Sequence, residues 1–154
     1  DYTTKKGGVA ILPQSREQAE VLPNRALALW QYSDIASPHV TWGNQHILVR
    51  AELEEGAFKV GFPNPRGWLA YWLDDTLFVK RATFDSHAKY YDFGSSSECY
   101  TNNKFLELET IAPISTLTPG ESATHIETWE LYSDVEYPKD EEAIQRIIEK
   151  TGLE

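Results

Sequence analysis

Residues 105–131 read FLELETIAPISTLTPGESATHIETWEL, and near the start Leu106 and Leu108 alternate with Glu107 and Glu109. Successive side chains of a β-strand point to opposite faces, so the two leucines would face a core and the two glutamates the other side. The segment therefore predicts a strand that buries one face and presents two carboxylates on the other. The Pro-Gly pair at residues 119–120 indicates a turn before a further apolar run.

Short segments rich in Val, Ile, Leu, Phe, Tyr and Trp recur along the whole chain between Gly, Pro, Asn and Asp residues. This pattern is typical of strands joined by turns. Strands are expected at residues 9–12, 26–32, 46–53, 58–62, 68–72, 77–84, 98–101, 105–110, 114–117 and 123–132.

The C-terminal segment, residues 138–152, predicts a helix instead. It begins with Pro138 and three acidic residues, which suit a first helical turn, and Gly152 is placed to end it. Its apolar stripe consists of Ala143, Ile144, Ile147 and Ile148. We therefore predict an all-β fold, an antiparallel β-sandwich of residues 1–137, with this one C-terminal helix packed on the same domain.

Composition narrows the class of protein. With 154 residues, 41% of them hydrophobic and 25% charged, the chain suits one globular domain with a substantial core. A net charge of −10, from 24 acidic and 14 basic residues, disfavours binding to nucleic acid. No apolar run approaches the ~20 residues that span a bilayer, and residues 1–14 lack the apolar region of a signal peptide, so we expect no membrane insertion. The single cysteine and the lack of an Asn-x-Ser/Thr glycosylation acceptor lead us to expect a cytoplasmic location.

Cysteine and histidine usage predicts neither a disulfide nor a cofactor. Cys99 is the single cysteine, which leaves no intrachain disulfide and no thiolate zinc cluster. His125 and Glu127 have a spacing that suits two metal ligands, but no third ligand is evident and a polar pair is the favoured interpretation. We expect no metal and no cofactor.

Aromatic residues crowd the segment PRGWLAYWLDD, which contains Trp68, Tyr71 and Trp72. Alternation places Trp68 and Trp72 on one face of the expected strand and Tyr71 on the other. Flat aromatic faces stack on the C–H faces of sugars, so these three are candidate sugar-binding residues. The alternative is that the tryptophans fill the sandwich core.

Most of the chain resembles a known family. The segments GGVAILPQ, LPNRALALWQYSD, WGNQHILVR, FKVGFPNPRGWLAYWLDDTLFVKR and YYDFGSSSECYTNNKFLELETIAPISTLTPGESATHIETWEL, within residues 7–132, resemble the C-terminal half of bacterial proteins of the galactose mutarotase-like (aldose 1-epimerase-like) superfamily. The resemblance implies a β-supersandwich that binds a sugar on a concave sheet face and, in its enzymes, interconverts the anomers at C1.

The resemblance also implies a catalytic base. In mutarotases the base is a carboxylate in a Glu-Thr strand motif before a Leu-x-Pro-Gly turn, and the segment LELETIAPISTLTPGES matches that pattern with Glu109 at the base position. Glu107 would then be a binding group or a surface neighbour on the same face. Ring opening also needs an acid for the ring oxygen. The family supplies a histidine in a Gly-x-His-Pro context, whereas Gly61-Phe62-Pro63-Asn64 contains none.

Two further polar residues are candidate sugar ligands. Lys80 shares a strand face with Phe78 and Ala82, so it would hold a sugar hydroxyl or carboxylate, or else pair with a surface acid. Glu98 resembles a position that is acidic in relatives of the family. Two function classes stay open: a sugar-binding mutarotase-like enzyme, and a non-catalytic β-sandwich that binds carbohydrate or assembles with itself.

Chain length predicts an oligomer. A large sandwich usually spans ~200–250 residues, so strands corresponding to half of one would leave open sheet edges. Two alternatives follow: the chain is a fragment, or it is a half-length protein that completes its sheets by self-association. We expect a second copy to cover those edges in a two-fold homodimer that leaves the face of Glu109 open to a sugar or sugar acid.

Overall fold

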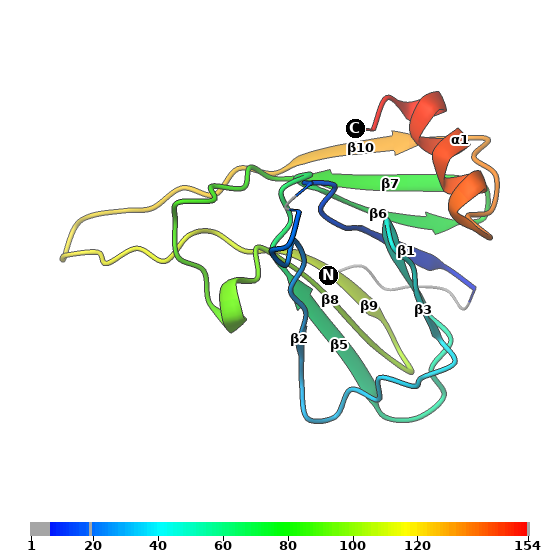
Figure 1. Ribbon diagram of the computed structural model, residues 1–154, viewed down its shortest axis with the longest axis horizontal. Helices are drawn as coiled ribbons and strands as arrows, with labels where there is room; N and C mark the ends of the chain where they lie inside the picture. Colours follow the sequence, from blue (N-terminus) through cyan, green and yellow to red (C-terminus); the bar gives the residue numbers. More distant parts are fainter. Residues whose placement is uncertain (1–6, 19, 154) are drawn as a thin grey trace.

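The computed structural model describes residues 7–18 and 20–153, which form two antiparallel sheets and a C-terminal helix (Figure 1). The six-stranded sheet has the order β10-β7-β6-β1-β4-β3 and the four-stranded sheet the order β2-β5-β8-β9. The strands of the larger sheet are β1 (Val9–Pro13), β3 (Val40–Trp42), β4 (His46–Arg50), β6 (Trp68–Leu73), β7 (Thr76–Arg81) and β10 (Thr128–Tyr132). Those of the smaller sheet are β2 (Ala28–Leu29), β5 (Ala57–Phe62), β8 (Ser97–Asn102) and β9 (Leu106–Thr110), and the helices are η1 (Asp92–Gly94) and α1 (Glu141–Thr151).

The first hydrophobic core lies between the two sheets. In β9, Leu106 and Leu108 are buried in this core, whereas Glu107 and Glu109 are half-buried on the other face. The predicted alternation is therefore confirmed. The same alternation in β6 sends Tyr71 into this core and Trp68 to the opposite side of the larger sheet.

The second hydrophobic core lies between the larger sheet and α1, so the fold has three layers. The predicted helix is confirmed, with its first residue at Glu141 and Pro138 before it. Asp140 is the N-cap, because its side chain accepts a hydrogen bond from the Ala143 amide at 2.8 Å. Gly152 ends the helix in the left-handed region at φ 69°, which costs glycine little.

The larger sheet extends beyond the smaller one at its β7–β10 end. β9 lies against β6, and at the other end Trp42 of β3 packs on Phe58 of β5. β7 still contributes Phe78 to the core between the sheets, whereas the inner side of β10 is largely uncovered. We call the inner side of these two strands the overhang; there Trp129 is 65% exposed and Leu131 is 69% exposed.

The strand predictions were wrong at several boundaries. The strand expected at residues 114–117 is absent, because residues 113–126 form an exposed arm that projects from the body without strand pairing (Figure 1). For the same reason the strand expected at 123–132 begins only at Thr128. The strand expected at 26–32 is reduced to β2, and β3 was not predicted, since only one of its three side chains is buried.

Within the described part of the chain, neither helix has the length and apolar character to cross a membrane.

Candidate functional site

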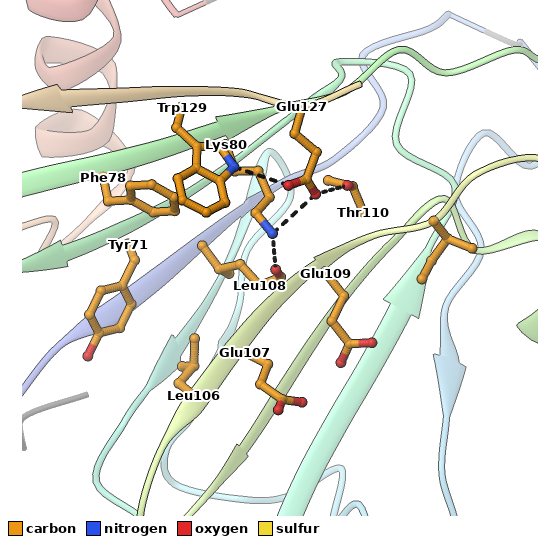
Figure 2. Close-up of a pocket in the computed structure, with 11 residues that line it drawn as sticks. Tyr71, Phe78, Lys80, Leu106, Glu107, Leu108, Glu109, Thr110, Glu127 and Trp129 are labelled. Atoms are coloured by element: carbon orange, nitrogen blue, oxygen red, sulfur yellow. Dashed lines mark hydrogen bonds and ion pairs between the residues drawn. The ribbon is translucent and has the colours of Figure 1, made fainter. Parts of the chain in front are cut away.

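A cavity of about 610 Å³ opens where the overhang meets the edge strand β9 (Figure 2). Its lining comes from β6, β7, β9, β10 and the residues that flank β9 and β10. The lining residues are Tyr71, Phe78, Lys80, Leu106, Glu107, Leu108, Glu109, Thr110, Ile111, Glu127 and Trp129. Four of the seven residues predicted from the sequence, namely Glu107, Glu109, Lys80 and Tyr71, therefore border one cavity.

Lys80 joins the two sides of this cavity. Its Nζ donates to the Leu108 carbonyl of β9 at 2.8 Å and pairs with Glu127 Oε1 at 3.2 Å. Figure 2 shows the ammonium group between β9 and Glu127. Lys80 is thus held by two partners, and its side chain is only 15% exposed.

Glu127 is the most extensively hydrogen-bonded carboxylate of the cavity. It accepts hydrogen bonds from Thr110 Oγ1 and, at 3.1 Å, from Trp129 Nε1. The Thr110 hydroxyl donates its proton to Glu127. Thr110 Oγ1 therefore accepts a hydrogen bond from His125 Nε2, which lies 2.8 Å away. Burial alone would raise the pKa of Glu127, but the hydrogen bonds and Lys80 outweigh it and lower the pKa. Glu127 therefore stays ionised.

Trp129 forms an aromatic wall of the cavity. Its ring packs edge-on against Phe78 at 5.7 Å between ring centroids, and Lys80 Nζ lies 5.8 Å from its centroid. The rest of the ring is exposed. The cavity thus offers a flat apolar ring face with hydrogen-bonding groups beside it.

Glu107 and Glu109 lie on the opposite side of β9 from Lys80 and Trp129 (Figure 2). Glu109 faces Glu98 across the β8–β9 pair, and both bind Lys59 of β5. The distances to Lys59 Nζ are 2.6 Å from Glu98 Oε2 and 3.1 Å from Glu109 Oε2. The Oε1 atoms of both carboxyls are buried without a hydrogen-bond partner among the described residues.

The two carboxyls of this cluster differ in environment. The side chain of Glu98 is 2% exposed and that of Glu109 is 27% exposed. Burial raises the pKa of Glu98 to about 7 even though Lys59 opposes the rise, and the charge of Glu109 adds to it. Burial lowers the pKa of Lys59, but the two glutamates outweigh it and hold Lys59 in its charged form. Lys59 is therefore shared by two carboxyls, of which the buried one titrates near neutral pH.

Glycine at position 61 makes room for this cluster. Gly61 is the β5 residue opposite Glu98, and a Cβ there would lie 2.5 Å from Ser95 Oγ and 3.3 Å from Glu98 Cγ. A side chain at position 61 would thus clash with Ser95 and press against the Glu98 side chain.

The two predicted tryptophans lie outside the cavity. Trp68 is fully buried in the core under α1, so the core interpretation holds for it and the sugar-stacking one finds no support. Trp72 is half-buried on the same side of the sheet. Its Nε1 donates to the Val135 carbonyl at 2.8 Å and its ring packs on Tyr137 at 5.0 Å.

Asn64, which stands where the family pattern has histidine, has a structural role. It is buried, and its Nδ2 donates to the Trp68 carbonyl at 2.9 Å and to Ser97 Oγ at 3.0 Å. No histidine is among the residues that line the cavity. Within the described residues there is also no group of three or more side chains placed to hold a metal ion.

Lys59, Glu127 and Trp129 were not predicted as site residues. Lys59 could have been recognised by alternation, since it shares a strand face with Gly61 in FKVGF. Trp129 and Glu127 join the cavity only because β10 pairs with β7, which places Trp129 opposite Lys80.

Comparison of the chain with models of known protein families, with curated proteins and with solved structures found no match in any of the three. The resemblance to the galactose mutarotase-like superfamily therefore stays a prediction.

Proposed function

We propose that this β-sandwich protein binds a sugar or a sugar acid in the cavity between β9 and the overhang. The observation that carries the proposal is a cavity bordered by the exposed ring of Trp129 and the Lys80–Glu127 ion pair, with Glu107 and Glu109 on the far side of β9. Its volume of about 610 Å³ lies within the ~300–1,000 Å³ usual for small-ligand sites. The indole would stack on the sugar ring, and Glu127 beside it would accept hydrogen bonds from the sugar hydroxyls.

We further propose a chemical step at this site, the interconversion of sugar anomers, with Glu109 as the general base. Glu109 would take the proton of the C1 hydroxyl while an acid protonates the ring oxygen, which opens the ring. Glu109 lies across β9 from the Trp129 ring, and the neighbouring carboxyl of Glu98, whose pKa is about 7, is too buried for direct contact with a ligand. Binding is therefore better supported than catalysis.

Binding is tested by titrating a panel of hexoses, hexuronates and hexosamines while following Trp fluorescence. We expect a saturable change that is lost in Trp129→Ala and Glu127→Gln. Glu136→Gln is the matched control, because Glu136 is also an ion-paired glutamate, bound to Arg146, but lies outside β10 and outside the cavity lining. No response of the wild-type protein at millimolar ligand would refute the proposal.

Catalysis is tested separately by polarimetry with a pure anomer of any sugar that binds. We expect acceleration above the spontaneous rate that is lost in Glu109→Gln and kept in Glu107→Gln. Binding without acceleration would favour the second function, a non-catalytic carbohydrate-binding or self-assembling sandwich.

A further inference from the structure

The four terminal strands of the two sheets differ in how well their edges are protected. β2 has two residues and β3 has three, and such short edges offer little backbone for pairing. The edge of β9 is partly closed, because Lys80 occupies the Leu108 carbonyl. β10 has five residues and no strand beside its outer edge in the described part of the chain, and it exposes Trp129 and Leu131.

A long, apolar and uncovered edge strand invites pairing with another strand. We infer that β10 is the contact strand of a two-fold homodimer, in which the β10 strands of two copies pair antiparallel into one continuous sheet. The inference does not depend on sugar binding, because it follows from the sheet edge alone.

The sequence of β10 is self-complementary in this arrangement. The register that pairs all five residues is centred on Glu130, so Trp129 faces Leu131 of the second copy and Thr128 faces Tyr132 of the second copy. Directly opposed residues of an antiparallel pair share a sheet face. The two exposed apolar side chains of each copy therefore meet those of the other on the inner face, as a two-fold interface requires.

The charges at the β10 edge also allow a second copy of the chain to pair there. The chain carries −10 overall, which opposes association. At the edge, however, Glu130 pairs with Arg81 at 2.9 Å and Glu127 pairs with Lys80 at 3.2 Å. The two Glu130 side chains would approach each other at the two-fold axis, and the negative charge of each is balanced by Arg81 of its own chain.

The dimer would extend the cavity. A two-fold axis perpendicular to the larger sheet keeps the inner faces of both copies on the same side, so the two smaller sheets stand on that side with the two overhangs between them. The two overhangs then form the base of one continuous groove between the two smaller sheets. Each cavity gains Leu131 of the second copy beside its own Trp129, so the wall that is open in one chain is completed by the other.

The first test is the mass of the full chain by sedimentation equilibrium over a hundredfold range of concentration. We expect a dimer for the wild-type protein and a monomer for Leu131→Lys, because a lysine there would place two cations in the apolar contact. Ile35→Lys is the matched control, since Ile35 is 65% exposed against 69% for Leu131 but lies in a loop outside β10, and it should stay dimeric. Circular dichroism checks that each variant is folded.

The second test is a cross-link at the axis. Opposed Cα atoms of an antiparallel pair lie roughly 4.5–5.5 Å apart, which a disulfide spans. Mild oxidation should therefore convert Glu130→Cys, but not Ile35→Cys, to a covalent dimer, and Cys99 is buried and should not interfere. A wild-type protein that is monomeric throughout would overturn the inference. So would a dimer that survives Leu131→Lys and does not cross-link through position 130, because its interface would lie elsewhere.

Discussion

The two faces of the six-stranded sheet differ in what covers them, and two tryptophans show the consequence. On the outer face α1 seals Trp68, which has no exposed surface. On the inner face the smaller sheet stops at β9, and Trp129 beyond it is 65% exposed. Both residues belong to strands with ordinary alternation. The presence of a third layer, and not the residue type or the strand pattern, decides which tryptophan stabilises the fold and which is available to a ligand.

Polar contacts reinforce the sealed face. His46 is buried, and its Nδ1 lies 2.6 Å from Glu141 Oε2 of α1. Arg66 Nη1 lies 3.1 Å from His46 Nε2. An arginine can only donate, so Nε2 accepts and the proton of neutral His46 sits on Nδ1, donated to Glu141. This chain of three residues fastens α1 to the sheet, and the overhang has no counterpart to α1.

The largest effect should come from removing the sealed tryptophan. Trp68→Ala would delete a fully buried ring and leave a cavity under α1, so we expect the free energy of unfolding to fall by about 3–5 kcal/mol. Urea denaturation followed by circular dichroism measures the change. A loss below about 1 kcal/mol would mean that the outer face is not sealed as described.

Breaking the polar fastening of α1 should cost less. Glu141→Ala removes the acceptor for His46 Nδ1 and for the amides of Gln45 and His46, which lie 3.2 Å and 3.0 Å from Glu141 Oε1. We expect a loss of about 1–3 kcal/mol in the free energy of unfolding, as for buried donors left without a partner. The exposed neighbour Glu142 provides the control, and Glu142→Ala should stay within about 0.5 kcal/mol of wild type.

The sealed face should also be sensitive to acid. Burial lowers the pKa of His46 below its ordinary 6.5, despite the opposing effect of Glu141, and Arg66 and Arg16 lower it further. The unfolded chain therefore binds the proton first, and the contribution of His46 to stability, complete above pH 6.5, falls as the pH drops below that value. The difference in the free energy of unfolding between wild type and His46→Gln should therefore shrink as the pH falls below 6.5. A difference that is independent of pH would contradict the assignment.

The cluster on the smaller sheet should respond to pH in the opposite direction. The pKa of Glu98 is raised from an ordinary 4.5 to about 7, so the folded chain holds a proton that the unfolded chain has lost between these values. The contribution of this carboxyl is fully present below pH 4.5 and is lost as the pH rises through 7. Stability relative to Glu98→Gln should therefore decline as the pH rises. Carbon-detected NMR of the Glu98 carboxyl gives an independent measure, and titration near 4.5 would contradict the prediction.

The sequence predicted those parts of the fold that depend on local pattern. Alternation in β9 and the capping and apolar stripe of α1 are properties of neighbouring residues, and both predictions were confirmed. The failed strand at residues 114–117 has suitable residues but no strand to pair with, which a local pattern cannot reveal. The site was predicted in part for the same reason: Glu109 and Lys80 stand out in their own segments, whereas Trp129 and Lys59 gain importance from the strands beside them.

The smallest effect on stability should come from the exposed tryptophan, which sharpens the comparison with Trp68. Trp129 keeps one edge contact with Phe78 and one hydrogen bond to Glu127, and most of its surface is already in water. Little apolar surface is lost when it is truncated, so Trp129→Ala should change the free energy of unfolding by no more than about 0.5–1 kcal/mol. The measurement must be made dilute enough for the chain to be monomeric, so that lost association does not appear as lost stability. A loss as large as that of Trp68→Ala would show that Trp129 is buried by a layer of the protein and is not open to a ligand or a second copy.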